Sequence, residues 1–148
     1  METKIPPPIV TLIFGLSIYF SREMFPSVEI QHSSYLGMFL LLMGFFILTS
    51  AVRLFRKDDT TVNPLSPEKA TKLVKDGIFK YTRNPMYLGM AFMLGSISAF
   101  FNLLGGIILI AIFCAYITKF QIIPEERAMK DLFPHDFEKY IKSTRRWI

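Results

Sequence analysis

The residues of this sequence best suited to chemistry lie in two short stretches. The stretch GIFKYTRNPMYLG brings Tyr81, Arg83, Asn84 and Tyr87 together where a polar segment gives way to an apolar one. In the second stretch, IIPEER, an apolar run ends at a proline followed by two glutamates. Ionisable groups at membrane depth are functional candidates because burying them is costly, and adjacent carboxylates repel each other unless a cation neutralises them. We predict that the two stretches face each other and build one site.

Each of these residues also has a purely structural explanation. A flanking arginine can reach lipid phosphates, and an Asn-Pro pair can begin a helix. Tyrosines are common at membrane surfaces, and glutamates in a first helical turn complement the helix dipole. The residues weighed in this way are Tyr81, Arg83, Asn84, Pro85, Tyr87, Glu125 and Glu126. Taken together they are harder to dismiss than taken singly.

Several other kinds of site lack support in the sequence. It contains no G-x-G-x-x-G or phosphate-loop pattern, no Gly-x-Ser-x-Gly and no H-E-x-x-H. The single cysteine, Cys114, cannot form an internal disulfide, and His32 and His135 lie far apart without zinc-type partners. We therefore expect no metal.

Four apolar blocks predict the fold. The chain has 148 residues, of which 51% are hydrophobic and 20% charged, and the charges are segregated from the apolar blocks. A helix that crosses a bilayer needs about 20 apolar residues. We predict an all-α integral membrane bundle, organised as one domain over 1–148, with four transmembrane helices at about 8–20, 35–55, 86–101 and 103–123. A cleaved signal peptide is the alternative for the first block, although no small-x-small cleavage site follows Phe20.

The basic residues predict the topology. Formal charge is +5, yet nearly all Lys and Arg lie in the middle polar segment or after the last apolar block. Positive residues mark cytoplasmic loops, so this placement favours a multi-pass membrane protein with both termini cytoplasmic rather than one that binds nucleic acid. In this topology Arg22 is the one basic residue predicted to lie on the side of the membrane away from the cytoplasm.

Two polar regions connect or follow these spans. In the cytoplasmic loop 56–80 we expect a short helix at 67–74 that ends at Gly77. Pro124 is expected to stop or kink the fourth span, and a helix is predicted at 125–133. After this helix, apolar residues are interleaved with Lys and Arg, which is typical of a helix that lies on a membrane surface. The apolar residues are Phe137, Tyr140, Ile141 and Trp147.

The second half of the chain resembles the membrane methyltransferases grouped around isoprenylcysteine carboxyl methyltransferases and phospholipid N-methyltransferases. The shared pattern is Gly-x-[Tyr/Phe]-x-x-x-Arg-[His/Asn]-Pro-x-Tyr-x-Gly, a helical hairpin, Glu-Glu, and aromatic and basic residues near the C-terminus. The matching residues are Gly77, Phe79, Arg83, Asn84, Pro85, Tyr87, Gly89, Glu125, Glu126, Tyr140 and Trp147.

The resemblance implies S-adenosylmethionine as methyl donor, bound by the stretches 77–89 and 124–147. The arginine would take the donor's carboxylate, either glutamate would pair with its ammonium or ribose hydroxyls, and the tyrosine rings would face adenine or the sulfonium. The implied cofactor-binding residues are Tyr81, Arg83, Asn84, Pro85, Tyr87, Glu125 and Glu126. Arg83 and Glu126 are the positioning candidates, and no catalytic residue is assigned.

One departure keeps the acceptor open. Asn84 stands where the carboxyl methyltransferase branch usually has histidine, and the phospholipid branch's glycine-rich donor motif is not evident, Gly44 being the nearest candidate. The acceptor could be a prenylcysteine-like carboxylate, a lipid amine headgroup or another lipophilic small molecule. The alternative function is a non-catalytic membrane scaffold or lipid-binding protein that retained the fold.

Overall fold

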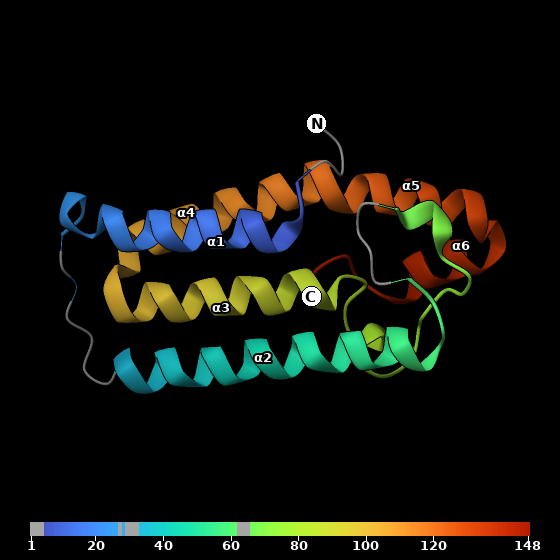
Figure 1. The fold of residues 1–148 in the computed structure, drawn as a ribbon, viewed down its shortest axis with the longest axis horizontal. Coiled ribbons are helices and arrows are strands. Elements are labelled where there is room, and N and C mark those ends of the chain that lie inside the picture. Colours follow the sequence, from blue (N-terminus) through green and yellow to red (C-terminus); the bar gives the residue numbers. More distant parts are fainter. Residues whose placement is uncertain (1–4, 27, 29–32, 62–65) are drawn as a thin grey trace.

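Every regular element of the described chain is helical (Figure 1). The computed structural model describes residues 5–26, 28, 33–61 and 66–148. The long helices are α1 (Pro7–Phe20), α2 (Ser33–Lys57), α3 (Pro85–Phe101), α4 (Leu103–Ile117), α5 (Ile123–Leu132) and α6 (Pro134–Ser143). The short ones are η1 (Ser21–Met24), η2 (Pro67–Lys69), η3 (Gly77–Lys80) and the π-helical η4 (Thr118–Ile122). The prediction of an all-α fold is confirmed.

The four predicted apolar helices all form, but they differ in length. Two helical stretches are long and apolar enough to cross a membrane, namely α2 and the continuous run Leu103–Leu132 that joins α4, η4 and α5. The apolar α3 is shorter, and α1 is shorter still. Prolines occupy the first turn of both α1 and α3, where their missing N–H is not needed.

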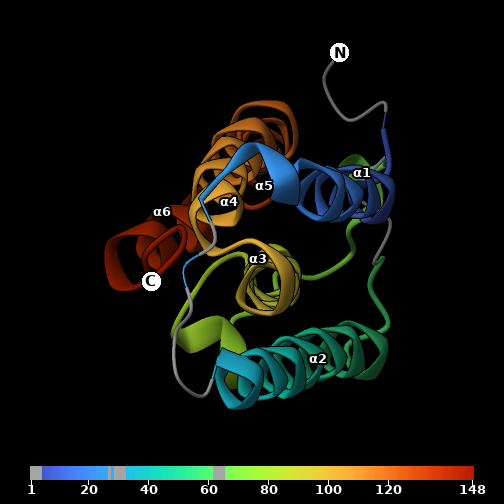
Figure 2. The ribbon, with the colours of Figure 1, turned by 90° about the vertical axis from the view of Figure 1, so that its left-hand side faces the viewer.

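Helix α3 lies at the centre of the bundle, with α2 on one side and α1 and α4 on the other (Figure 2). The α2–α3 contact is close because two glycines meet in it. A Cβ atom built on Gly44 would lie 2.7 Å from the carbonyl oxygen of Gly89, and one built on Gly89 would lie 2.8 Å from that of Gly44. Gly44, the nearest candidate for a glycine-rich donor motif, thus lies in the contact between two helices, where a small residue lets the backbones approach closely.

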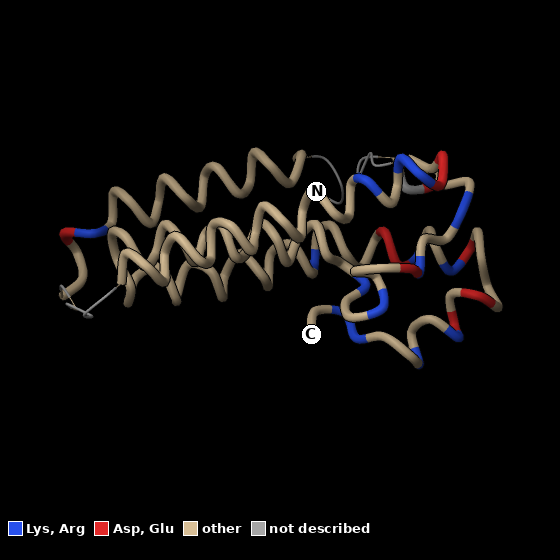
Figure 3. The backbone as a smooth tube through the Cα atoms, turned by 90° about the horizontal axis from the view of Figure 1, so that it is seen from below, with Lys and Arg blue, Asp and Glu red and all other residues tan. Residues whose placement is uncertain are grey.

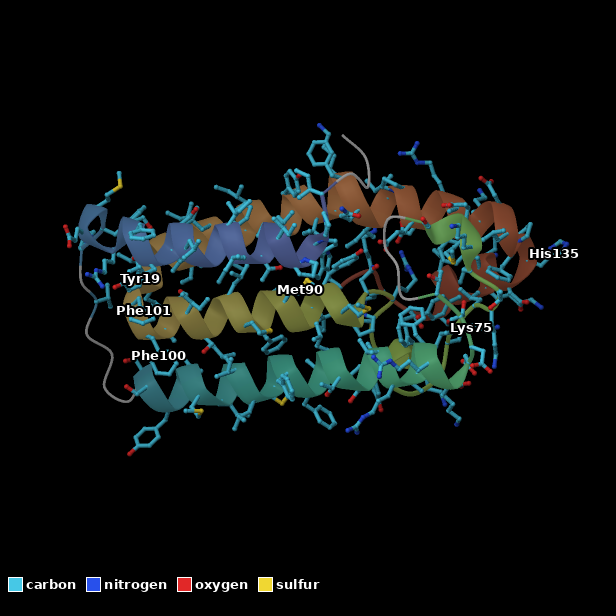
Figure 4. The ribbon with its side chains drawn as sticks, viewed as in Figure 1. Tyr19, Lys75, Met90, Phe100, Phe101 and His135 are labelled. Atoms are coloured by element: carbon cyan, nitrogen blue, oxygen red, sulfur yellow. The ribbon has the colours of Figure 1, made fainter. Side chains whose placement is uncertain are left out.

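Aromatic side chains close the bundle at the end where α3 turns into α4. Figure 4 shows Tyr19, Phe100 and Phe101 there, at the opposite end of the molecule from Lys75 and His135. The rings of Tyr19 and Phe101 meet edge to face with 5.1 Å between centroids.

Charged residues gather at the other end, and the helices between carry few (Figure 3). Residues 53–84 and 119–146 supply most of these charges, and Arg22 and Glu23 form a small charged group at the aromatic end. The charged end of the molecule is therefore the place to look for a polar site.

Two local predictions, for 67–74 and for Gly77, are wrong. The helix expected at 67–74 shrinks to the single turn η2, and Gly77 begins η3 instead of ending a helix. Gly77 takes φ +58°, a conformation that favours glycine, and its missing Cβ makes room for Leu54. Of the two outcomes expected at Pro124, a stop is not observed: the helical run continues into α5, and the wider π turn directly before the proline leaves room for its ring.

The C-terminal aromatic residues pack inside the protein and not against its surroundings. Phe137 is 3% exposed and Tyr140 is 5% exposed, and both belong to a small core with Ala51, Val74 and Phe79. The expectation of an interfacial helix is therefore corrected for these two side chains, although Ile141 remains 41% exposed. The core exists because α6 folds back onto the loop before α3.

Candidate functional site

A cavity of about 270 Å³ lies where the bundle meets the charged end. Its walls come from the first turns of α1 and α3, the end of α2, the loop before η3, and helices α5 and α6. Most of the wall is apolar, and includes Phe55, Val74, Phe79, Met90 and Met129. The polar lining contains Arg83, Asn84, Tyr87, Glu125 and Glu126. Such a mostly apolar pocket with a few converging polar groups is typical of small-molecule sites.

The structure brings six of the seven predicted site residues to this cavity. Arg83, Asn84, Pro85 and Tyr87 come from the start of α3 and the two residues before it, and both glutamates come from the first turn of α5. Tyr81 is the exception: it is 79% exposed and does not line the cavity. It directly follows η3, four residues before the first residue of α3.

Asn84 does not cap α3 with its side chain, contrary to the expectation for an Asn-Pro pair. Its amide Nδ2 instead donates to the carbonyl oxygen of Arg146 at 2.9 Å. Only its backbone carbonyl accepts within the helix, from the N–H of Leu88. The asparagine therefore ties the start of α3 to the C-terminal segment, a role that an amide can fill without titrating.

Arg83 and Glu126 form a buried ion pair at one corner of the cavity. The Nη2 atom of Arg83 lies 2.7 Å from Oε1 of Glu126, and the two side chains are 9% and 17% exposed. Nη1 of Arg83 donates to the carbonyl oxygen of Thr144, while its buried Nε has no partner among the described groups. The cation required by the adjacent glutamates is therefore present, but it neutralises Glu126 only.

A second arginine completes this corner. Arg146 holds Glu126 through Nη2–Oε2 at 2.7 Å and Nε–Oε1 at 3.1 Å. Burial raises the pKa of Glu126, but the hydrogen bonds and charges of Arg146 and Arg83 outweigh burial and leave the pKa below its ordinary value. Glu126 is thus ionised, and both of its carboxylate oxygens accept hydrogen bonds from arginine. Sequence reasoning missed Arg146 as a site residue; the need of paired carboxylates for cations was the available signal.

Glu125 lies in different surroundings, beyond the apolar run that ends at Ile123. Its Oε1 accepts a hydrogen bond from the hydroxyl of Tyr87, and no basic residue of the described chain forms an ion pair with it. Burial raises the pKa of Glu125 to about 7, the Tyr87 hydrogen bond opposes this, and the charge of Glu126 adds to it. The cavity therefore offers a cationic ligand one carboxylate that no cation yet occupies.

The C-terminal segment closes the polar side of the site. Besides the contacts above, the N–H of Arg83 donates to the Arg145 carbonyl at 2.9 Å, and Tyr140 donates to the Phe79 carbonyl at 2.6 Å. Trp147 donates from Nε1 to the hydroxyl of Thr118 in the π turn at 3.1 Å. The loop before α3 and the end of the chain are thus held as one unit.

Comparison with known proteins gives one match. The family model described as phospholipid methyltransferase matches residues 32–136, which confirms the resemblance drawn from the sequence. No curated protein matches the chain, and no solved structure does either. The two long apolar helices and this match together indicate a protein of the membrane. Because the match covers more than half of the chain, this protein belongs to the phospholipid methyltransferase family, whose function is methyl transfer to a membrane substrate.

Proposed function

We propose that this protein transfers a methyl group from S-adenosylmethionine to a lipophilic acceptor embedded in the membrane. The observation that carries the proposal is the Tyr87–Glu125 pair, in which a carboxylate that forms no ion pair within the described residues faces a mostly apolar cavity. When bound, S-adenosylmethionine supplies an electrophilic methyl group on a sulfonium. The donor's positive charges and the acceptor's apolar body would require a cavity of this mixed character.

The residues present fit the donor in three respects. Glu125 would bind the donor's ammonium or a ribose hydroxyl, and the ring of Tyr87 would lie beside a cationic group. Arg83 would offer its buried Nε, which has no partner within the described chain, to an anionic or polar group. Its two other nitrogens are already engaged, so the bidentate grip on a carboxylate expected from sequence is not proposed.

The apolar walls would hold the acceptor and exclude water. Pro7, Phe55 and Met90 come from three helices that meet at the cavity, two of them on opposite sides of α3. A lipid would enter sideways, from the membrane, while the donor enters from the charged end. Rate enhancement would come mainly from alignment of the two reactants in a dry site.

The charge distribution supports the proposed topology. Four helices would cross or enter the membrane, and the end rich in Lys and Arg would face the cytoplasm together with both termini. The acceptor would be a lipid amine headgroup, a prenylcysteine-like carboxylate or another lipophilic molecule. A carboxylate would act unaided once ionised, whereas an amine must lose a proton before it can be methylated.

Binding of S-adenosylmethionine and S-adenosylhomocysteine to detergent-purified protein tests the proposal. Wild type should bind both, and Glu125→Gln should weaken binding about tenfold or more, because a hydrogen bond to a charged group contributes about 1.5–3 kcal/mol. Glu138→Gln, which changes an exposed glutamate on α6, is the matched control and should bind like wild type. If folded wild-type protein binds neither compound, the proposed function is wrong and the alternative of a non-catalytic scaffold or lipid-binding protein is favoured.

The acceptor is then sought with labelled donor. Purified protein in vesicles that contain phosphatidylethanolamine, a prenylcysteine analogue or a membrane lipid extract would be assayed for label in the organic phase. Transfer to one acceptor class and not to the others would identify it.

A further inference from the structure

Arg146 lies outside the residues that the family model matches, which end at 136. It nevertheless makes more polar contacts to the site than any other residue of the C-terminal segment. Its guanidinium binds both carboxylate oxygens of Glu126, at 3.1 and 2.7 Å. Its backbone carbonyl accepts from the Asn84 amide at 2.9 Å and from the Thr82 hydroxyl at 3.2 Å. The residue therefore joins α5 to the start of α3.

The neighbouring arginine shows that this arrangement is specific. Arg145 is exposed, and its side chain forms no ion pair within the described chain, although its backbone carbonyl accepts from Arg83. Both adjacent arginines accept hydrogen bonds at their backbone carbonyls from the stretch before α3, but only the side chain of Arg146 contacts Glu126. This pair provides a matched comparison within the protein.

The contact with Arg146 makes the two glutamates unequal. Glu126 has one guanidinium on Oε2 and shares Oε1 between Arg146 and Arg83. Both carboxylate oxygens of Glu126 accept from an arginine, whereas the one donor to Glu125 among the described residues is the Tyr87 hydroxyl. A cation that enters the cavity would have to displace a guanidinium from Glu126, but no charged group of the described chain from Glu125.

We propose that Arg146 is a positioning residue, which by holding Glu126 leaves Glu125 as the carboxylate that binds a cationic group of the methyl donor. The inference rests on the proposed function, since it assumes that the donor binds in this cavity. It assigns different roles to the two glutamates, one structural and one in ligand binding. It also makes the end of the chain part of the site.

The test depends on the charges around Glu125. The titratable and charged side chains around Glu125 and Glu126 belong to α3, α5, the loop before η3 and the C-terminal segment. Lys72 on the far wall is paired with Asp58, and so it does not neutralise Glu125. The titratable and charged groups concerned are Tyr87, Glu126, Arg83, Arg146, Lys72 and Tyr140.

The first experiment measures the affinity for S-adenosylhomocysteine at pH 7 in four proteins. Arg146→Gln should weaken binding about fivefold, because the charge of Glu126 is then less compensated, which raises the pKa of Glu125 and lowers its ionised fraction at pH 7. Arg145→Gln should remain within about twofold of wild type, since its side chain touches no carboxylate. Arg146→Lys should bind more tightly than Arg146→Gln but less tightly than wild type, because an ammonium keeps the positive charge but cannot form the bidentate contact with Glu126.

The second experiment measures the same affinity from about pH 5.5 to 8.5. Arg146→Gln exposes Glu125 to more of the charge of Glu126, so the midpoint of its pH profile should move up. Glu126→Gln removes that charge and leaves two arginines, so its midpoint should move down. Both variants break the same ion pair, and a merely structural role would shift both midpoints alike or neither.

The outcomes separate this inference from the proposed function. If wild type fails to bind S-adenosylhomocysteine, the proposed function fails first. If wild type binds but Arg146→Gln matches Arg145→Gln, or the two midpoints move together, then the positioning role is wrong while donor binding stands. Should Arg146→Gln unfold, as judged by its melting temperature, the contrast between Arg146→Lys and Glu126→Gln decides the question.

Discussion

The apolar bundle and the charged end of this molecule are stabilised by different forces. In the bundle, side chains such as Ile18, Leu94 and Phe113 are fully buried, and glycines let helices approach closely. At the charged end, the loop before α3 is fixed to the C-terminal segment by hydrogen bonds and ion pairs, with only a small core beneath. The cavity lies at the junction of the two regions.

The difference teaches where function can be changed without loss of the fold. Close packing responds to volume, because interiors have few voids and a clash with backbone cannot be relieved by a rotamer change. A polar network responds to charge and to lost donors. Substitutions that add volume should therefore damage the bundle, and substitutions that alter charge should act on the cavity and the C-terminal segment.

The largest effect is expected at the glycine contact between α2 and α3. Gly44→Leu should prevent the native bundle from forming, because even a Cβ atom would lie 2.7 Å from the Gly89 carbonyl oxygen. Gly95→Leu is the control, since its Cβ would meet only the end of the Leu40 side chain at 3.4 Å. The measurement is the yield of monodisperse protein in detergent and its melting temperature. Equal behaviour of the two variants would show that α2 and α3 do not pack as described.

The next largest effect should be confined to the charged end. Arg83→Ala leaves Glu126 with one cation and the Thr144 carbonyl with one donor fewer, and breaking a buried ion pair costs about 3–5 kcal/mol. Hydrogen exchange should rise in the C-terminal segment while α2 and α3 stay protected. Lys80→Ala removes an exposed residue whose contact to Asp76 is 4.0 Å, and should leave exchange unchanged. Faster exchange throughout the bundle in Arg83→Ala would contradict the division into two regions.

The bundle was the more predictable of these regions. Apolar blocks, prolines and turn residues indicate where helices begin and end, because these are local properties of the chain. The prediction failed at 67–74 and did not include the π turn η4, and at both places the structure depends on contacts. A π turn precedes Pro124, and residues of the loop are held by the hydroxyl of Thr60, which accepts from the N–H groups of Thr71 and Lys72.

The sequence predicted which residues form the site but not the hydrogen bonds and ion pairs between them. Residue types and spacing identified the two stretches, and six of seven predicted residues line the cavity. The sequence could not show that Asn84 turns to the C-terminal segment or that Arg146 reaches back to Glu126, since both contacts span more than fifteen residues. Nor could it separate two adjacent glutamates, whose difference arises from their partners: Glu125 contacts Tyr87 of α3, and Glu126 contacts two arginines outside the helices.

A pH effect of intermediate size should distinguish Glu125 from Glu126. Burial raises the folded-state pKa of Glu125 to about 7 from an ordinary value of 4.5, so the folded state binds the extra proton between these values. Glu125 therefore lowers stability as the pH rises through this window, by on the order of 2 kcal/mol after allowance for its partial exposure. Glu126 has a lowered pKa, and its contribution is lost only as the pH falls below the ordinary value. Melting temperatures of wild type and Glu125→Gln across about pH 4.5–8 measure this. The variant should show a flatter profile, and parallel profiles would mean that Glu125 is not buried as described.

The smallest effect is expected from one hydroxyl at the charged end. Tyr140→Phe removes the 2.6 Å hydrogen bond to the Phe79 carbonyl but keeps the ring, which is 5% exposed and packs in the small core. Loss of one buried hydrogen bond costs about 1 kcal/mol, and the carbonyl is left without that donor. Tyr81→Phe makes the same chemical change at a ring that is 79% exposed, and should alter neither stability nor donor binding. Chemical denaturation in mixed micelles would measure both variants. If Tyr81→Phe were the more damaging of the two, the exposed tyrosine would have a role in the site that its position outside the cavity does not provide, and the boundary drawn between the cavity and the surface would have to move.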